Sequence, residues 1–320
     1  MDIAQETITA EKRIRPYIRE TLLEYSPYYS ALSGAEIYFK LENLQFTGSF
    51  KVRGAMNKVL SLTAAERKRG VVTASTGNHG AATAFCLAKL AAGGIVFVPE
   101  SASAVKVQAI ERLGAEVRCY GDDSAVTEAY ARRFARDNGL TYVPPYNDPQ
   151  VIGGQGTIAV ELSRQLERID AIFVALGGGG LISGIAGYLK SIHPDVTIIG
   201  CSPQNSQVMI QSVRAGEILD LPSRPTISDG TAGGVEPGSI TFDLCRDLVD
   251  EFEVVTEDDI KQSLREFMQI HHMMIEGSAA VAIAACLKQG ARFAGKNVVV
   301  VLCGANISLE TLKIVLFGKL

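Results

Sequence analysis

From about residue 70 onward, the chain alternates short apolar runs with longer amphipathic segments. The first pairs are "GVVTAS" with "HGAATAFCLAKL" and "GIVFVP" with "SAVKVQAIERLG"; later pairs are "AIFVALGGGG" with "LISGIAGYLKSI" and "NVVVVLCGANIS" with "LETLKIVLFGKL". Continuous apolar runs with helices between them are typical of parallel strands buried on both faces of a sheet. The sequence therefore predicts an α/β fold.

The alternation is interrupted in two places. The segment "NDPQVIGGQG", near residues 147–156, is predicted to be a loop that crosses between domains. Residues 202–256 are less regular, and "SDGTAGGVEPGSIT" within them is predicted to be a glycine-rich surface or pocket loop. Because 320 residues is about twice the length of a typical domain, we expect two domains or one large α/β unit with an insertion.

Charge and hydropathy restrict the partners of the chain. The net charge is −4 and no run of like charges occurs, which argues against a nucleic-acid or membrane-surface partner. No window approaches the roughly 18 uninterrupted apolar residues of a membrane-spanning helix, and the N-terminal "MDIAQETITAEKRIRPY" lacks the apolar core of a signal peptide. We therefore expect a cytoplasmic protein that acts on a small molecule.

The six cysteines are scattered without C-x-x-C spacing, so they predict neither a disulfide framework nor a zinc site. The sixth, Cys303, ends the last apolar run, and the carboxyl ends of parallel strands are where α/β proteins bind ligands. For Cys303, core packing and ligand contact both stay open. The other five are predicted to be small core residues: Cys86, Cys119, Cys201, Cys245 and Cys286.

Lys51 stands between Phe50 and a helix-forming run in "SFKVRGA", directly after an extended apolar segment. One interpretation is a surface lysine whose methylene stem lies along apolar surface. The other is an amine in a pocket, its pKa lowered by desolvation, that attacks a carbonyl group and forms a Schiff base.

Two strand-to-helix turns contain residue types that bind anions. In "TASTGNHGAATAF" the turn offers backbone N–H groups and hydroxyls at a helix N-terminus, which suit a carboxylate, although an ordinary N-cap uses the same residues. In "VALGGGGLISG" four glycines follow a strand and open a helix, an arrangement that suits a phosphate. Ser183 replaces the third glycine of a dinucleotide fingerprint, and one tight turn would explain only one or two of the glycines.

Together these motifs make the chain resemble the fold type II pyridoxal-phosphate enzymes, specifically the threonine/serine dehydratase and serine racemase group. The matching motifs are "TGSFKVRGA", "STGNHG", "GGGGLISG", "EGSAA" and "CGAN", in the order of that family and across essentially the whole chain. The resemblance favours the Schiff-base interpretation of Lys51. It implies two open, twisted, mostly parallel sheets flanked by helices, with a large domain of residues 1–63 and 145–320 and a small inserted domain of residues 64–144.

The resemblance also implies a role for each matching residue. Lys51 would hold pyridoxal 5'-phosphate as a Schiff base and, once freed, remove the Cα proton of the substrate. Phe50 would lie against the cofactor ring, and Asn78 would hydrogen-bond the ring hydroxyl. The phosphate would be bound by Gly177, Gly178, Gly179 and Gly180. The substrate carboxylate would be held, largely through backbone amides, by Ser75, Thr76, Gly77, Asn78 and His79.

Two further residues of the implied pocket concern the cofactor ring. Cys303 stands where the family usually has a serine facing the pyridine nitrogen. A neutral partner leaves the ring a weaker electron sink than a carboxylate would, which favours prompt loss of a β-hydroxyl. Glu276, in "IEGSAAVA", matches a glutamate that lines the same pocket, while an N-terminal helix charge is the alternative.

The chain departs from the family pattern in ways that bear on its reaction. Thr76 replaces the second serine that eukaryotic-type serine racemases use as a proton donor, and the acidic residues of their divalent-ion site are replaced by Ser202, Ser206 and Val208. These replacements argue against racemisation and against activation by a divalent ion, and we expect no metal site. The chain ends soon after "LFGKL", so we expect no isoleucine-binding regulatory domain. The 229–240 loop is longer by one residue than in threonine dehydratases and introduces Glu236, as in dehydratases assigned to hydroxyectoine utilisation.

The sequence as a whole favours an ammonia-lyase that performs β-elimination on a β-hydroxy-α-amino acid such as L-threonine or L-serine, and the resemblance also implies a homodimer or homotetramer. Three alternatives stay open. They are a dehydratase of hydroxyectoine catabolism, a serine racemase, and a regulatory protein that binds pyridoxal phosphate without catalysis.

Overall fold

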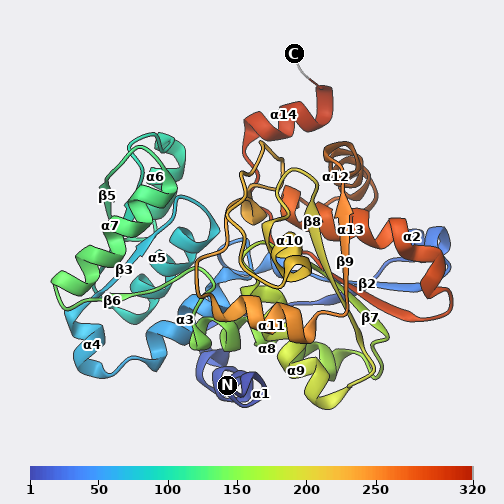
Figure 1. The fold of residues 1–320 in the computed structure, drawn as a ribbon, viewed down its shortest axis with the longest axis horizontal. Coiled ribbons are helices and arrows are strands. Elements are labelled where there is room, and N and C mark those ends of the chain that lie inside the picture. Colours follow the sequence, from blue (N-terminus) through green and yellow to red (C-terminus); the bar gives the residue numbers. More distant parts are fainter. Residues whose placement is uncertain (319–320) are drawn as a thin grey trace.

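The computed structural model describes residues 1–318 and contains two mostly parallel sheets, as expected (Figure 1). The larger sheet has the strand order β1-β2-β10-β7-β8-β9, and only β1 and β2 pair antiparallel. Its strands are β1 (Leu23–Tyr25), β2 (Glu36–Lys40), β7 (Ala171–Ala175), β8 (Thr197–Pro203), β9 (Glu251–Val255) and β10 (Asn297–Val301).

The smaller sheet has the order β5-β4-β3-β6 and is parallel throughout. Figure 1 shows it, with its helices, on one side of the molecule. Its strands are β3 (Val71–Ala74), β4 (Gly94–Val98), β5 (Glu116–Cys119) and β6 (Thr141–Tyr142). The helices between them are α5 (Asn78–Leu90), α6 (Ala104–Glu111) and α7 (Ser124–Asp137).

The remaining helices cover the larger sheet or join the two parts. The α-helices are α1 (Ile3–Ile14), α2 (Pro27–Ser33), α3 (Lys51–Ser61), α4 (Ala64–Arg69), α8 (Pro149–Gln165), α9 (Gly180–Ile192), α10 (Val208–Ala215), α11 (Ile240–Leu248), α12 (Glu257–His271), α13 (Gly277–Gln289) and α14 (Leu309–Phe317). The 3-10 helices are η1 (Arg15–Tyr17), η2 (Glu42–Leu44), η3 (Asp229–Thr231) and η4 (Gly290–Phe293). Residues 319 and 320 of the segment "LETLKIVLFGKL" lie outside the described part of the chain.

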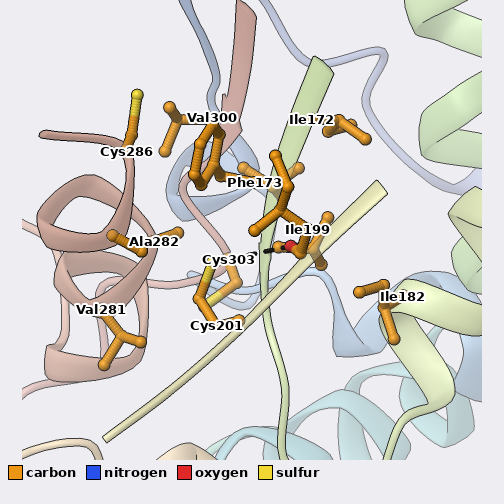
Figure 2. Close-up of a cluster of buried hydrophobic side chains, with 14 of the residues drawn as sticks. Ile172, Phe173, Ile182, Ile199, Cys201, Val281, Ala282, Cys286, Val300 and Cys303 are labelled. Carbon is orange, nitrogen blue, oxygen red and sulfur yellow. Dashed lines mark hydrogen bonds between the residues drawn. The ribbon is translucent and has the colours of Figure 1, made fainter. Parts of the chain in front are cut away.

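The main core lies between the central strands of the larger sheet and the helices on its two faces. Figure 2 shows Phe173 and Val300 of the central strands beside Ala282 of α13, with Ile182 of α9 on the other side of the sheet. All four side chains are buried. The apolar runs of the sequence become buried strands because helices cover both faces.

The expectation of a loop at "NDPQVIGGQG" is wrong, because this segment begins the 17-residue helix α8. Asp148 caps the helix by accepting hydrogen bonds from two backbone N–H groups, and Pro149 occupies its first position. Its glycines allow close helix packing: a Cβ atom on Gly154 would lie 2.6 Å from the Cα of Gly54 in α3. The glycines therefore indicate a crowded helix interface and not a turn.

The expectation for the cysteines is correct for four of the five predicted core positions. Cys86, Cys201, Cys245 and Cys286 are buried, whereas Cys119 is exposed at the end of the edge strand β5. An edge strand has no neighbour on one side, which leaves its last residue open to water. Within residues 1–318, no helix combines the length and the apolar character needed to cross a membrane.

Candidate active site

The end of β10 and the start of α3 are joined, and this junction positions Lys51. Ser49 forms an antiparallel bridge with Gly304, and the backbone N–H of Phe50 donates to the carbonyl oxygen of Cys303 at 3.1 Å. Lys51 is the first residue of α3. The predicted lysine is thereby fixed beside the carboxyl end of a central strand, where open α/β sheets bind ligands.

The Lys51 amine points into the protein and not into solvent. Its Nζ donates a hydrogen bond to the carbonyl oxygen of Pro145 at 2.8 Å, and it lies 5.2 Å from the centre of the Phe50 ring. Burial lowers the pKa of Lys51 to about 8, and the nearby Cys303 and Glu276 oppose this shift only in part. The amine is therefore much closer to its neutral, nucleophilic form at neutral pH than an ordinary lysine.

The glycine segment, residues 177–180, connects the end of β7 to the start of α9. Gly179 has φ +86°, in the left-handed region, and occupies the N-cap position of α9. A Cβ atom on Gly178 would lie 2.5 Å from the ring of Tyr146, and one on Gly177 would lie 2.9 Å from the backbone of Thr231. The backbone N–H groups at a helix start have no partner within the helix, so this segment suits a phosphate.

The turn between β3 and α5 contains three of the five predicted substrate-binding residues, and Asn78 and His79 begin α5. The Ser75 hydroxyl accepts from the backbone N–H of Gly77 at 3.2 Å, which shapes the turn. Thr76 is half-buried, and Gly77 is exposed. The N–H groups that begin α5 are therefore placed at a partly open surface where a carboxylate could reach them.

The side chain of His79 has a structural position. It is buried, and its Nε2 atom lies 2.9 Å from the carbonyl oxygen of Val143. Burial and the nearby Lys51 lower the pKa of His79 to about 3, so the ring is neutral. Only the backbone N–H of His79 is then available to an anion.

Glu276 joins three parts of the site. Asn78 Nδ2 donates to both of its carboxylate oxygens at 3.0 Å, and the backbone N–H of Asn306 donates to Oε2 at 3.0 Å. Glu276 is also the N-cap residue of α13, so both the pocket and the helix-charge interpretations describe its position. Burial raises the pKa of Glu276 to about 7, and the Asn78 amide opposes the shift.

Cys303 is a core residue at the carboxyl end of a central strand. It is buried in the main core, where Figure 2 shows it beside Cys201, and it lies two residues after the end of β10. Burial, together with the charge of Glu276, holds the pKa of the Cys303 thiol well above its usual value. The thiol is therefore protonated at neutral pH and offers a neutral group to a neighbour.

Two residues of the site were missed in the sequence. The Pro145 carbonyl accepts from Lys51, and the neighbouring Tyr146 packs on the glycine segment. A backbone carbonyl carries no sequence signature, whereas the aromatic residue in "VPPYND" was a usable signal.

Three residues stand where the divalent-ion site of the racemases has acidic side chains, and each of them packs within the protein. Ser202 is buried and its hydroxyl donates to the carbonyl oxygen of Leu176 at 2.7 Å, while the hydroxyls of Ser206 and Ser223 lie 2.7 Å apart. Val208 is the first residue of α10 and is buried. Among residues 1–318, no three His, Cys, Asp or Glu side chains are grouped as metal ligands.

A partly buried lysine of lowered pKa, a glycine segment suited to phosphate and a neutral buried thiol are compatible with the aldehyde, the phosphate and the ring nitrogen of pyridoxal 5'-phosphate. The fold and these groups together fit an α/β enzyme that binds this cofactor. The family profile described as "Pyridoxal-phosphate dependent enzyme" matches residues 14–304. The chain belongs to this family.

Curated relatives cover nearly the whole chain. It is 39% identical to the L-threonine ammonia-lyase of Thermotoga maritima over 303 residues. The match covers 94% of this chain and 75% of the relative. It is also 39% identical to the catabolic L-threonine dehydratase TdcB of Escherichia coli K12 over 307 residues. This match covers 95% of this chain and 93% of the relative.

Solved structures of similar proteins have the same fold. The processed form of threonine deaminase isoform 2 from Solanum lycopersicum has a TM-score of 0.94 at 33% identity, covering 98% of this chain and 92% of the other. Maize serine racemase has a TM-score of 0.92 at 33% identity, covering 97% and 95%. Both dehydratases and racemases are thus similar to this chain.

Proposed function

We propose that this enzyme is an ammonia-lyase that converts a β-hydroxy-α-amino acid, such as L-threonine or L-serine, to a 2-oxo acid and ammonia. The observation that carries the proposal is the buried Lys51 amine, with its pKa lowered to about 8, in a chain 39% identical to threonine ammonia-lyase and dehydratase relatives. Elimination of water from Cα and Cβ leaves an unsaturated amine, and addition of water to the released product gives the 2-oxo acid and ammonia.

Pyridoxal 5'-phosphate, when bound, supplies an electron sink that makes the Cα proton of an amino acid acidic. The residues assigned to hold it are Phe50, Lys51, Asn78, Gly177, Gly178, Gly179, Gly180, Glu276 and Cys303. The residues assigned to the substrate carboxylate are Ser75, Thr76, Gly77, Asn78 and His79. These assignments rest on the family motifs, and the positions of the residues around one strand-end region support them.

Lys51 is the catalytic residue of this proposal. Because its pKa of about 8 is near neutral pH, the amine is able to accept a proton from Cα and release it again. The Pro145 carbonyl, a neutral acceptor, holds the amine in place without the charge that would raise its pKa.

Cys303 and Glu276 set the character of the pocket. With the cofactor bound, the protonated Cys303 thiol would offer the ring nitrogen a neutral partner, which would stabilise negative charge at Cα less than a carboxylate partner would and so favour early loss of the β-hydroxyl. Glu276, with a pKa near 7, keeps Asn78 oriented through two hydrogen bonds.

A serine racemase is the second candidate, and the specific observation that favours it is the likeness to maize serine racemase. Racemisation requires a proton donor on the face of the substrate opposite Lys51, and Thr76 stands at the position assigned to it. A hydroxyectoine-catabolic dehydratase stays a third candidate because of Glu236. Glu236 accepts hydrogen bonds from Arg132 at 3.1 Å and from Asn147 at 2.9 Å, which ties the 229–240 loop to α7.

The proposal also includes the domain division, the location and the assembly of the protein. The division into residues 1–63 with 145–320 and residues 64–144 is supported by the distribution of strands between the two sheets. A cytoplasmic location is supported by six cysteines that are all unpaired in the described chain. Assembly as a homodimer or homotetramer, and a site that needs no metal ion, follow from the family motifs.

The test is a panel of β-hydroxy-α-amino acids incubated with the purified holoenzyme, with ammonia and 2-oxo acid both measured. We expect equal amounts of the two products from at least one L-amino acid. Inversion of serine faster than its deamination would establish the racemase instead. Binding of the cofactor with neither reaction on any member of the panel would support the regulatory-protein alternative.

A further inference from the structure

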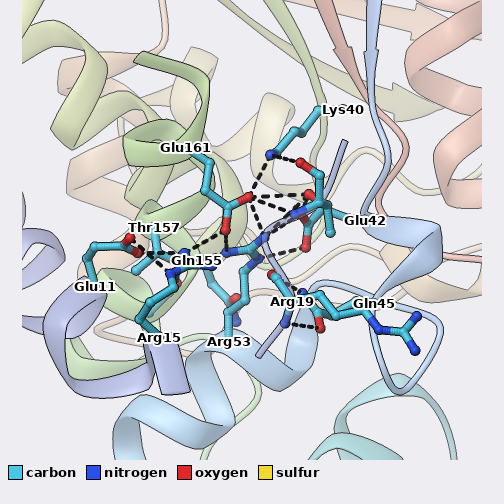
Figure 3. Close-up of polar contacts among 12 residues, drawn as sticks. Glu11, Arg15, Arg19, Lys40, Glu42, Gln45, Arg53, Gln155, Thr157 and Glu161 are labelled. Carbon is cyan, nitrogen blue, oxygen red and sulfur yellow. Dashed lines mark hydrogen bonds and ion pairs between the residues drawn. The ribbon is translucent and has the colours of Figure 1, made fainter. Parts of the chain in front are cut away.

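A buried cluster of charged and polar side chains lies under the start of α3. We call it the Arg53 cluster; Figure 3 shows most of its members. Arg53 and Glu161 of α8 are fully buried, as is Glu42 of η2. The residues that Arg53 contacts in the cluster are Thr21, Glu42, Thr157 and Glu161, and Glu161 also pairs with Lys40 and Arg15.

The Arg53 guanidinium uses all three of its nitrogen atoms in this cluster. Nε and Nη2 each donate to one oxygen of Glu42 at 2.7 Å. Nη1 and Nη2 donate to the two oxygens of Glu161 at 2.7 and 2.9 Å, and Nη1 also donates to Thr157 at 3.1 Å. One planar group thus joins two carboxylates in a fixed geometry that a lysine could not reproduce.

Arg53 and Glu161 are both charged at neutral pH. Burial alone would lower the pKa of Arg53, but the two carboxylates outweigh it and raise that pKa above its ordinary value. Burial would raise the pKa of Glu161, yet Arg53 and Lys40 hold it well below its ordinary value. The ion pair between Arg53 and Glu161 therefore persists at neutral pH.

Arg53 is two residues after Lys51 in the same helix. Two residues turn an α-helix by about 200°, so the two side chains leave α3 on nearly opposite faces. Lys51 extends to the Pro145 carbonyl, and Arg53 extends to α8 and η2. Phe50 gives α3 no side-chain cap, so the residues just before the helix are held to the end of β10 through backbone contacts of Ser49 and Phe50, and Arg53 supplies a side-chain anchor on the opposite face.

The acceptor of Lys51 belongs to the same assembly. Pro145 lies four residues before the start of α8, and the carboxylate of Glu161 lies on α8 itself. A contact of 2.7 Å between Arg53 and Glu161 therefore holds α3 on the element that follows the Pro145 carbonyl. The interface between α3 and α8 also contains the close approach of Gly154 to Gly54.

We propose that Arg53 is a positioning residue for the reaction: by joining Glu42 and Glu161 it sets the direction of α3 and so places the Lys51 amine. Buried ion pairs contribute little net stability, because desolvation of the charges offsets their attraction. Their fixed geometry is better explained by a requirement for position than by a requirement for stability. The inference rests on the proposed catalytic role of Lys51.

The main test is Arg53→Lys in the holoenzyme, because this change keeps the buried charge and lets the chain fold while removing the two-carboxylate geometry. We expect kcat to fall about 10- to 100-fold with KM nearly unchanged, the effect of displacing a reacting group by about 1 Å. We also expect the pH midpoint of the visible absorbance of the bound cofactor to move.

A readout without the cofactor is the pH dependence of Lys51 acetylation in the cofactor-free chain, followed by mass spectrometry. The matched control is Lys40→Met, because Lys40 is also fully buried and donates to Glu161 at 2.6 Å but lies on β2 and not on α3. We expect the control to lose stability and to keep the wild-type acetylation midpoint, whereas Arg53→Lys shifts it.

Two results together would overturn the inference and leave Arg53 a structural residue. The acetylation midpoint of Lys51 would be the same in the wild type and in Arg53→Lys, and kcat would fall only in proportion to the folded fraction. Failure of the proposed function is separable, because it would appear as no release of ammonia by the wild-type holoenzyme. The acetylation midpoint reports the surroundings of Lys51 in either case.

Discussion

The Nζ atom of Lys51 lies 2.8 Å from the carbonyl oxygen of Pro145, in the segment that connects β6 to α8. The partner of the amine is a neutral dipole, and among residues 1–318 no carboxylate forms an ion pair with Lys51. Desolvation of the amine is therefore not balanced by a direct opposite charge, and its pKa falls to about 8.

Lys51→Ala should abolish the visible absorbance of the bound cofactor and lower turnover by on the order of 10³-fold or more, because covalent catalysis is lost. The measurement is the absorbance spectrum together with ammonia release. Lys58→Ala is the matched control: Lys58 lies on the same helix but pairs with Asp148 at 2.5 Å, so its loss should cost stability and leave the spectrum intact. Near-normal turnover by Lys51→Ala would overturn the assignment of the catalytic lysine.

Glu276 should contribute less to the stability of the cofactor-free protein as pH rises from about 4.5 to about 7. Its folded pKa of about 7 lies above the ordinary 4.5, so in this window Glu276 binds more protons in the folded state than in the unfolded state. Its contribution to stability then decreases with pH, by roughly 3 kcal/mol at most for a shift of this size, while the lowered pKa of His79 acts in the opposite direction.

Glu276→Gln removes this titration and should raise the stability at pH 8 relative to that at pH 5, compared with the wild type. The measurement is urea unfolding of both proteins at pH 5 and pH 8, with the difference between the two pH values compared. An unchanged difference in the variant would place the titration on another group. Because each protein is compared with itself at the two pH values, the pH-independent cost of altering the hydrogen bonds to Asn78 cancels.

The strands and turns of the site were predictable because their signals are local. The apolar runs at residues 71–74, 171–175 and 297–301 became β3, β7 and β10, and the polar or glycine-rich residues after them lie at the strand ends. Helix α8 was not predictable in the same way. Its glycines have the composition of a loop, and only the close approach of other helices explains them.

The placement of Arg53 was also beyond sequence reasoning. An arginine is normally predicted to lie at the surface, and its burial here depends on Glu42 and Glu161, which are far apart in the sequence. Pro145 gave no signal because its contribution is a backbone carbonyl. Local patterns thus pointed to Lys51 as the candidate catalytic residue, while the contacts that orient it are tertiary.

Cys303→Ser should keep most of the activity, because a hydroxyl, like the protonated thiol, offers a neutral partner to the cofactor ring nitrogen. Cys303→Asp should instead favour protonation of that nitrogen and prolong negative charge at Cα, changing the ratio of elimination to racemisation about tenfold, or ~1.4 kcal/mol. The measurement is the product ratio from L-serine in the three proteins. The same ratio in all three would place Cys303 away from the ring.

The final prediction concerns the fate of the substrate after the Cα proton has left. Returning a proton on the face opposite Lys51 requires an acid within hydrogen-bonding reach, and Thr76 is the residue at that position in the family pattern. Its β-branch restricts χ1, and its extra methyl makes it less able than serine to reach that face. Elimination needs only a proton for the leaving hydroxyl, so elimination should exceed racemisation in the unmodified enzyme.

Thr76→Ser should therefore raise the racemised fraction of recovered L-serine, since serine keeps the hydroxyl and regains rotational freedom at χ1. Chiral chromatography of the recovered substrate, run beside an ammonia assay, gives both rates from one reaction. Thr76→Val is the control, because it keeps the β-branch and lacks the hydroxyl; it should leave racemisation at or below the wild-type level. If Thr76→Val racemised serine as well as Thr76→Ser did, the returning proton would not come from residue 76, and the reaction choice would have to be explained by another acid in the pocket.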